Sequence, residues 1–269
     1  MQKSLNIVLL LLLLFTIVLF AASCNKEPEP KKPLSSAEQK PKAPPALETM
    51  KDNLDQIIAG LESKKKMESD SYLAQDSHMI ANEKSGKSKK SAGQESSAQE
   101  NWEKEIKALK NLHQNWNTLE PESLKAGLGI TARNNFEEGL EQLSGEISQE
   151  RVKESLFSSI KLYNNYADIV DVFANRIPSE FFRVKYESMS AICYGEDNNW
   201  QNAQEHASKL EECWETLKMQ AKDADKKLID KTQFAVQDLL KSIESQQADL
   251  LLIKGEILMK NLQKLEEEV

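Results

Sequence analysis

Apolar residues recur every three or four positions through the last two thirds of the chain, with polar and charged residues between them. One such row steps through Trp102, Ile106, Leu109, Leu112 and Trp116. This spacing places apolar side chains on one face of an α-helix, whereas no stretch here alternates with the two-residue period of a strand. The pattern therefore predicts an all-α bundle of about five to six helices. The rows cover residues 102–119, 136–147, 152–173, 182–192 and 200–217.

Signals that end helices are unevenly distributed between these rows. Residues 195–199 (GEDNN) form the clearest turn signal, whereas the stretch from Lys218 to the end contains no proline and only Gly255. A single helix from 199 to 266 would be ~100 Å long, since each residue adds ~1.5 Å. That length exceeds the length of the other predicted helices, so we expect a break near residues 218–225.

An internal similarity involves every tryptophan of the chain. Trp102 and Trp200 are 98 residues apart, and so are Trp116 and Trp214. We interpret this as an internal duplication of a helical unit. The alternative is that two helices have converged on similar packing residues. The same offset pairs Asn101 with Asn199, Leu112 with Leu210, Thr118 with Thr216, Leu119 with Leu217, Ala126 with Ala224 and Phe136 with Phe234.

The tryptophans have two interpretations. Within each unit they are 14 residues apart, close to one helix face, and large rings on such a face normally pack into a core. The alternative is an aromatic groove for a sugar chain, a quaternary amine or a proline-rich peptide, with Trp116, Trp200 and Trp214 as candidate contacts. Trp200 follows two asparagines at a predicted helix start and is expected to be the most exposed of the four.

The N-terminus carries a different signal. Residues 7–20 are almost wholly apolar, and Ala21-Ala22-Ser23 then precede Cys24. About 14 residues make ~21 Å of helix, short of the ~30 Å needed to cross a bilayer, which favours an export signal over residues 1–23. The small residues before Cys24 resemble the lipobox of bacterial lipoproteins, although Ala21 stands where leucine is usual. An ordinary signal peptide or an uncleaved anchor are the alternatives.

The resemblance to a lipobox implies that Cys24 becomes the mature N-terminus and carries a diacylglycerol, with palmitate-type chains as the membrane anchor. Residues 24–98 that follow are rich in proline, lysine, serine and glutamate and predict a lipidated, largely disordered tether. A short amphipathic helix is expected at 46–64 within it. The alternative is an arm that covers the surface of the domain. The folded domain is expected at 99–269.

The residue types for catalysis are sparse. The three histidines, His78, His113 and His206, fall in no metal-binding spacing, and no nucleophile motif or phosphate-binding glycine loop occurs. Cys193 and Cys213 are expected to lie too far apart along a helical hairpin for a disulfide. The net charge of −8 argues against a nucleic-acid partner. We therefore predict no enzyme activity, catalytic residue, cofactor, metal or disulfide.

Three features together resemble the uncharacterised helical lipoproteins of anaerobic Gram-positive bacteria. They are the signal, the tether and the two helices with the sequence W-x-T-L, at residues 116–119 and 214–217. The long spacer, the missing catalytic groups and the helical duplication predict a non-enzymatic protein, lipid-anchored at the extracytoplasmic face of the cell membrane, whose bundle interacts with or scaffolds another envelope protein. The alternative is a lipoprotein that binds a small molecule or metal in a pocket between the Trp-containing helices.

Overall fold

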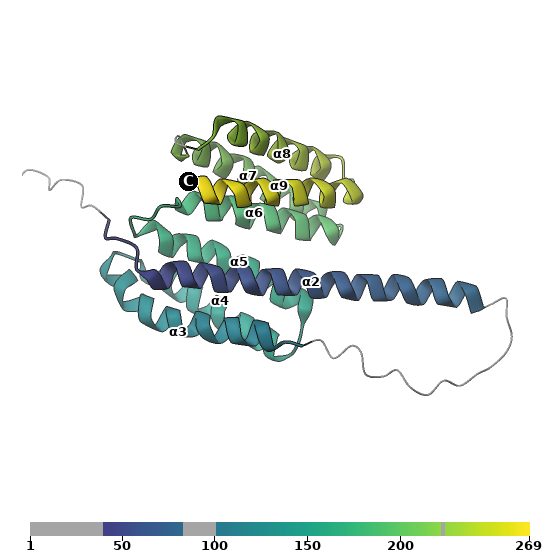
Figure 1. Ribbon diagram of the computed structural model, residues 1–269, viewed down its shortest axis with the longest axis horizontal. Helices are drawn as coiled ribbons and strands as arrows, with labels where there is room; N and C mark the ends of the chain where they lie inside the picture. The colour runs from purple at the N-terminus through teal and green to yellow at the C-terminus, as the bar shows by residue number, and fades with distance from the viewer. Residues whose placement is uncertain (1–39, 83–100, 222–223) are drawn as a thin grey trace, which may run out of the picture. The chain divides into compact units, whose positions relative to one another are not determined.

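The computed structural model describes residues 40–82, 101–221 and 224–269. The described residues form eight α-helices (Figure 1), which confirms the predicted all-α class. The expected count of five to six helices was too low. One additional helix lies before residue 99 and packs in the bundle, and the helical C-terminal region is interrupted twice, after Gln220 and after Glu244. The helices are α2 (Pro45–Asn82), α3 (Glu103–Lys125), α4 (Ile130–Ser148), α5 (Val152–Asp171), α6 (Ser179–Glu196), α7 (Trp200–Gln220), α8 (Lys226–Glu244) and α9 (Ala248–Glu268).

Helix α2 corrects the predicted domain boundary. The amphipathic helix expected at 46–64 begins at Pro45 and runs on to Asn82. It packs against α3 and α5, and the compact unit of the chain begins at Lys40 rather than at residue 99. The predicted signal peptide and the tether segments 24–39 and 83–98 lie outside the described residues. The apolar row of α2 is buried in the core: Leu47, Met50, Leu54, Ile57, Ile58 and Leu61.

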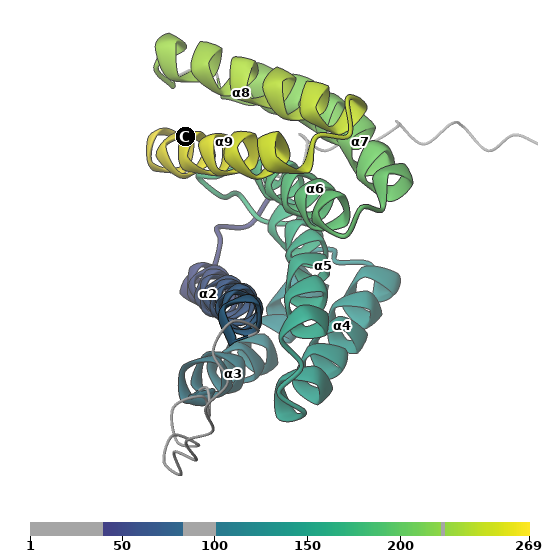
Figure 2. The same ribbon diagram turned by 90° about the vertical axis from the view of Figure 1, so that its right-hand side faces the viewer.

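Two groups of four helices share one topology. In the first group α2 packs on α3 and α5, and α4 packs on α3 and α5. The second group repeats these contacts, with α6 packing on α7 and α9, and α8 packing on α7 and α9. The groups meet where α5 packs on α6, in the middle of the unit (Figure 2). The internal duplication read from the tryptophans is therefore a duplication of a four-helix unit.

The turns between the third and fourth helix of each group share a positive φ and the same backbone hydrogen bond. Glu150 and Gln246, 96 residues apart, have positive φ values of 54° and 53°. The backbone N–H of Glu150 donates to Ile147 O at 3.0 Å, and that of Gln246 donates to Ile243 O at the same distance. Neither turn contains glycine or proline, which is why the second break, at 245–247, was not predicted. The first break lies between Gln220 and Lys226, within the expected region.

The offset between equivalent residues changes from 98 to 96 along the repeat. Trp116 and Trp214 keep the offset of 98, and their indole N–H groups donate to Glu137 and Gln233, which are 96 apart. The change arises in the connection between the second and third helices, where α7 ends earlier than α3. Phe136 is consequently not the equivalent of Phe234. Phe136 is fully buried against Trp116, whereas Phe234 is 67% exposed on α8.

Helices α6 and α9 approach closely because glycine lies at their contacts. A Cβ atom at Gly255 would lie 2.6 Å from Ile192 Cδ1, and one at Gly195 would lie even closer to the side chain of Leu251. A larger residue at either position would require the side chain of Ile192 or Leu251 to move. The close packing fixes the position of α9 over α6, and so the position of the site described next.

Candidate functional site

Two of the three tryptophan candidates are core residues. Trp214 is fully buried, and its Nε1 donates to Gln233 Oε1 at 2.7 Å. Trp116 is 5% exposed, and its ring centroid lies 4.6 Å from that of Phe136. Trp200 is half-buried at the start of α7, as expected from its position after two asparagines. The indoles of Trp116 and Trp214 therefore present no open face to a ligand.

The remaining sequence candidates are dispersed. Cys24, the predicted lipidation site, lies outside the described residues. Cys193 is buried and Cys213 half-buried, and both are free thiols. Burial raises the pKa of each thiol to about 12. Because the thiolate is the reactive form, the raised pKa values make both groups weak nucleophiles at neutral pH.

The two described histidines differ from each other. His113 is exposed on α3, with Nε2 2.8 Å from Ser144 Oγ. His206 is half-buried, with Nδ1 2.6 Å from Glu187 Oε2 and its ring stacked on Tyr194 at 5.3 Å. The hydrogen bond to a buried carboxylate offsets the cost of burying the polar His206 ring.

A hollow region lies at the junction of the two repeats. Helices α2 and α9 lie on the same side of α5 and α6 (Figure 2), although they come from opposite ends of the described chain. Three cavities of about 400, 530 and 520 Å³ follow this side. Lys51 and Glu266 line the first and second cavities, while Glu256 and Met259 line the second and third. We call this continuous row of cavities the junction groove.

A cluster of five polar side chains crosses the groove: Lys51, Asp55, Tyr163, Lys185 and Glu266. Lys51 Nζ lies 2.7 Å from Glu266 Oε1 and 3.3 Å from Asp55 Oδ2. Lys185 Nζ lies 3.0 Å from Asp55 Oδ1 and donates to Tyr163 Oη at 2.8 Å. Tyr163 Oη donates in turn to Asp55 Oδ1 at 3.0 Å. We call these five residues the junction cluster, since they come from α2, α5, α6 and α9 and join the two repeats.

Two members of the junction cluster, Lys51 and Tyr163, have raised pKa values. Burial alone would lower the pKa of Lys51, but the hydrogen bond to Glu266 and the charge of Asp55 outweigh it, so the pKa is raised. Burial and then the charge of Asp55 raise the pKa of Tyr163 well above its usual value. The phenol therefore stays protonated and Lys51 stays charged at neutral pH. Neither Tyr163 nor Lys51 is set up as a base, and a general base must be deprotonated to accept a proton.

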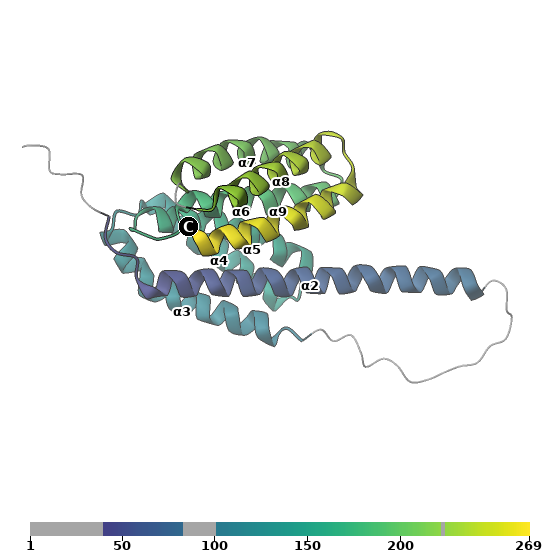
Figure 3. The same cartoon turned by 45° about the horizontal axis from the view of Figure 1, so that its top comes forward.

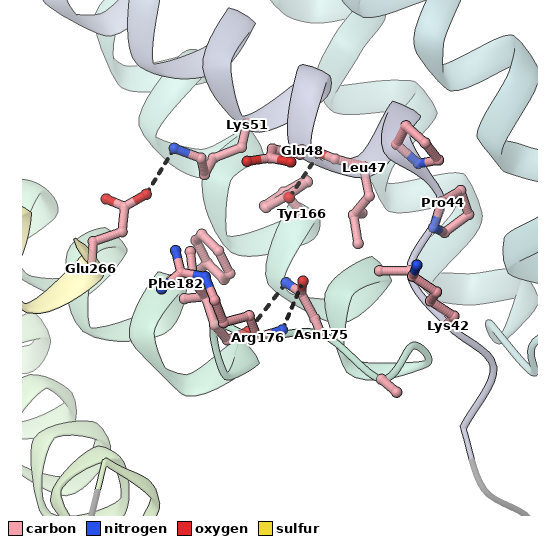
Figure 4. Close-up of a pocket in the computed structure, with 14 residues that line it drawn as sticks. Lys42, Pro44, Leu47, Glu48, Lys51, Tyr166, Asn175, Arg176, Phe182 and Glu266 are labelled. Carbon is pink, nitrogen blue, oxygen red and sulfur yellow. Dashed lines mark hydrogen bonds and ion pairs between the residues drawn. The ribbon is translucent and has the colours of Figure 1, made fainter. Parts of the chain in front are cut away.

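The first cavity, about 400 Å³, opens beside the start of α2 (Figure 4). Tyr166 and Phe182 lie behind it, and the Tyr166 hydroxyl donates to the backbone carbonyl of Leu47 at 2.9 Å. The segment before α2 is held by a short parallel bridge, in which Ala174 N donates to Pro41 O at 2.8 Å. This bridge places Lys42 at the cavity, with Arg176 at its edge. Glu48 and Glu266 also line the cavity, so its wall carries charges of both signs beside the two aromatic rings.

The third cavity, about 520 Å³, lies at the other end of the groove and is more apolar. Met189, Ile192 and Met259 line it, together with a rim of charged residues from α2 and α6. Lys65 of α2 reaches Glu196 of α6 across this rim. Burial and the charge of Glu196 raise the pKa of Glu62 above its usual value. The groove thus changes from polar at the α2 start to apolar near Met259.

Sequence reasoning missed the junction groove because its parts are distant in the chain. Asp55 and Lys185 are 130 residues apart. The apolar pattern of each helix does not predict which residue of the other helix pairs with it. The isolated lysine within the apolar row of α6 was a usable signal, since a charge at a core position needs a partner. In the described part of the chain, no group of three or more histidine, cysteine, aspartate or glutamate residues is arranged to hold a metal ion.

The chain was compared with protein-family models, curated proteins and solved structures. No protein-family model, curated protein or solved structure matches this chain. Among the described helices, none combines the length and the apolar character needed to cross a membrane.

Proposed function

We propose that this chain is a non-enzymatic lipoprotein that is anchored through a diacylglycerol on Cys24 and binds an envelope protein in the junction groove, outside the cytoplasmic membrane. The proposal for the anchor rests on the apolar segment 7–20 followed by small residues and Cys24. The proposal for the groove rests on a comparison of the two repeats.

One row of α9 carries the argument for a protein partner. Leu252, Glu256, Met259 and Gln263 face the junction groove. At the offset of 96, their equivalents on α5 are fully buried between α2 and α6: Leu156, Ile160, Tyr163 and Ala167. In the first repeat, this helix face therefore packs against two other helices of the same chain, α2 and α6. The same face of the second repeat is open, with Leu252 46% exposed.

The composition of these exposed α9 residues favours a reversible interface over a permanently buried one. Glu256 and Gln263 replace the buried Ile160 and Ala167, so the row tolerates water when it is empty. Leu252 and Met259 keep apolar surface for contact. Apolar contacts with polar neighbours are typical of interfaces that form and separate, whereas permanent interfaces are more apolar.

Photo-crosslinking in the native envelope tests the proposal. A benzophenone amino acid at Met259 or Leu252 is expected to give a discrete adduct with one envelope protein. The same residue at Met219 on α7, which is 64% exposed and distant from the groove, serves as the control. Adducts of equal yield from both regions, or none from the groove, would reject the groove as the binding site.

A small carboxylate in the cavity of Figure 4 is the second candidate ligand, favoured by Lys42 and Arg176 near Tyr166 and Phe182. This cavity lies beside Tyr166 and Phe182, not between the Trp-containing helices as the sequence suggested. A thermal-shift screen with small carboxylates would support it if a stabilising compound lost its effect in the Lys42→Ala, Arg176→Ala double variant.

A further inference from the structure

Helix α2, which forms one wall of the junction groove, is the counterpart of α6 in the second repeat. Lys51 and Lys185 correspond at an offset of 134, and both pair with Asp55 and with Glu266. The pair α2–α9 is therefore the counterpart of the pair α6–α5. Five buried residues of α2 match five buried residues of α6 at the same offset: Leu47 and Phe181, Met50 and Val184, Leu54 and Ser188, Ile57 and Ala191, and Leu61 and Gly195.

The helices α2 and α9 run in opposite directions along the groove. Lys51 pairs with Glu266 at one end, and Glu62 and Leu252 line the third cavity at the other. Figure 3 shows the C-terminal end of α9 towards the start of α2. Salt bridges near both ends of α5 and α6 give that pair the same antiparallel arrangement.

The α5–α6 interface is closed by aromatic rings, whereas the α2–α9 pair is open. The ring centroid of Tyr163 on α5 lies 5.8 Å from that of Phe182 on α6. At the offsets of 96 and 134, their counterparts are Met259 on α9 and Glu48 on α2. A carboxylate packed against an apolar side chain would lose its hydration without gaining a partner. Cavities therefore lie between α2 and α9, where the equivalent pair has packed side chains.

Both walls of the groove are helical along their length, which restricts what can enter it. The backbone N–H and C=O groups of α2 and α9 along the groove are paired within each helix, so the walls offer an extended strand no backbone partners. A helix, in contrast, brings its own backbone hydrogen bonds. The open row of α9 from Leu252 to Gln263 is ~17 Å long, which matches about three helical turns.

The two walls of the groove differ in polarity. Leu252 and Met259 of α9 line the third cavity together with Met189 and Ile192 of α6. The α2 wall contributes only charged residues to the second and third cavities. These charges are of both signs, so polarity rather than net charge distinguishes the two walls. An occupant that matches both walls has one apolar side and one polar side.

We infer, on the basis of the proposed function, that the envelope protein enters the junction groove with an amphipathic α-helix. The apolar row of this helix packs on α9 and fills the third cavity, and its polar side faces α2. Helices that bind in grooves use apolar anchors at helical spacing, and methionine side chains adapt to anchors of different shape. The helix supplies to α9 the apolar cover that α6 supplies to α5.

Two labelled peptides of identical composition test the helix. Each has about 18 residues, above the ~12–15 residues below which isolated helices are marginal, and contains leucine, glutamine and equal numbers of lysine and glutamate. In the first peptide leucine recurs every three or four residues, and in the second it alternates with polar residues at the period of a strand. Biolayer interferometry with the immobilised full-length chain should show about ten-fold or more tighter binding of the helix-period peptide. Equal binding of both peptides, or no binding of either, would overturn the inference.

Leu252→Glu and Leu250→Glu form a matched pair of variants on α9. The two leucines are 46% and 42% exposed, but Leu252 lines the third cavity, whereas Leu250 lies two residues away on another face of the helix. Leu252→Glu should weaken binding of the helix-period peptide by about ten-fold or more, because a carboxylate replaces an apolar contact. Leu250→Glu should leave it within about two-fold, with circular dichroism confirming the fold of both variants.

Three results with these variants count against the helix. Unchanged binding by Leu252→Glu, or equal losses in both variants, would place the peptide outside the groove. Self-association of the chain that Leu252→Glu abolishes would place a second copy in the groove instead.

The peptide measurement and photo-crosslinking at Met259 fail independently of each other. A crosslinked envelope protein, combined with a groove that does not distinguish the two peptides, would keep the proposed function and overturn the helix. Helix-selective binding that Leu252→Glu abolishes, without a crosslinked envelope protein, would keep the preference of the groove for a helix and remove the proposed partner.

Discussion

Phenylalanines 136 and 234 give a sharp test of the repeat register. They match at the offset of 98 that the tryptophans suggest, yet the structure buries Phe136 completely and leaves Phe234 67% exposed. Alanine at the two positions should therefore have very different effects. If the helices followed one constant offset, the two substitutions would cost similar amounts.

The magnitude follows from burial. A buried aromatic side chain removes roughly 150–250 Å² from water, which corresponds to about 4–6 kcal/mol at ~25 cal/mol per Å². This is an upper value, because the unfolded chain already buries part of that area, so Phe136→Ala should destabilise by about 3–5 kcal/mol. Phe234→Ala should cost about 1 kcal/mol or less, as surface substitutions do.

Denaturation in guanidinium chloride, followed by far-ultraviolet circular dichroism, measures both. The Phe136→Ala midpoint should fall far below the wild-type value, with the Phe234→Ala midpoint close to wild type. Equal losses of unfolding free energy at the two sites would refute the register with an offset of 96 in α8. A Phe136→Ala variant as stable as wild type would refute the core assignment itself.

Three further outcomes are expected. Trp116→Ala and Trp214→Ala should each destabilise by about 3–5 kcal/mol, since both indoles are buried, whereas His113→Ala should cost about 0.5 kcal/mol or less in the same denaturation assay; a fully stable Trp214→Ala variant would contradict this. Limited proteolysis should protect α2 in a resistant fragment that begins near Lys40, because α2 is part of the core; digestion within residues 45–64, read by mass spectrometry, would show that α2 detaches, whereas a cut between α2 and α3 would not. Iodoacetamide at pH 8 should label Cys193 and Cys213 about a thousand-fold more slowly in the folded than in the denatured chain. The reason is that a pKa of about 12 leaves roughly one thiol in ten thousand as the thiolate at this pH. Rapid labelling of the folded protein would contradict the raised pKa values.

The fold class and the duplication could be predicted because both depend on local patterns. Helical spacing shows which face is buried, and tryptophan is rare enough that matched pairs indicate a repeat. The role of α2 could not be predicted, since an amphipathic row between polar segments looks the same whether it is docked or free. The change in offset was also hidden, because it arises from a helix end that no glycine or proline marks.

The junction groove lay beyond sequence reasoning for a different reason. Asp55, Tyr163 and Lys185 meet across more than 100 residues of chain, and their contacts exist only after the two repeats have packed. Which apolar residues of α9 remain exposed depends on how α2 and α6 pack, and the sequence does not give that packing. Comparing equivalent positions of the two repeats recovers this information, since each repeat serves as the reference for the other.

The intact mass of the mature protein, extracted from membranes of the native host, tests the central proposal most directly. The account predicts a chain that begins at Cys24 and carries a diacylglycerol on that residue, and Cys24→Ala should release the protein or leave an uncleaved precursor. An unmodified mature N-terminus beyond Cys24 would contradict the account.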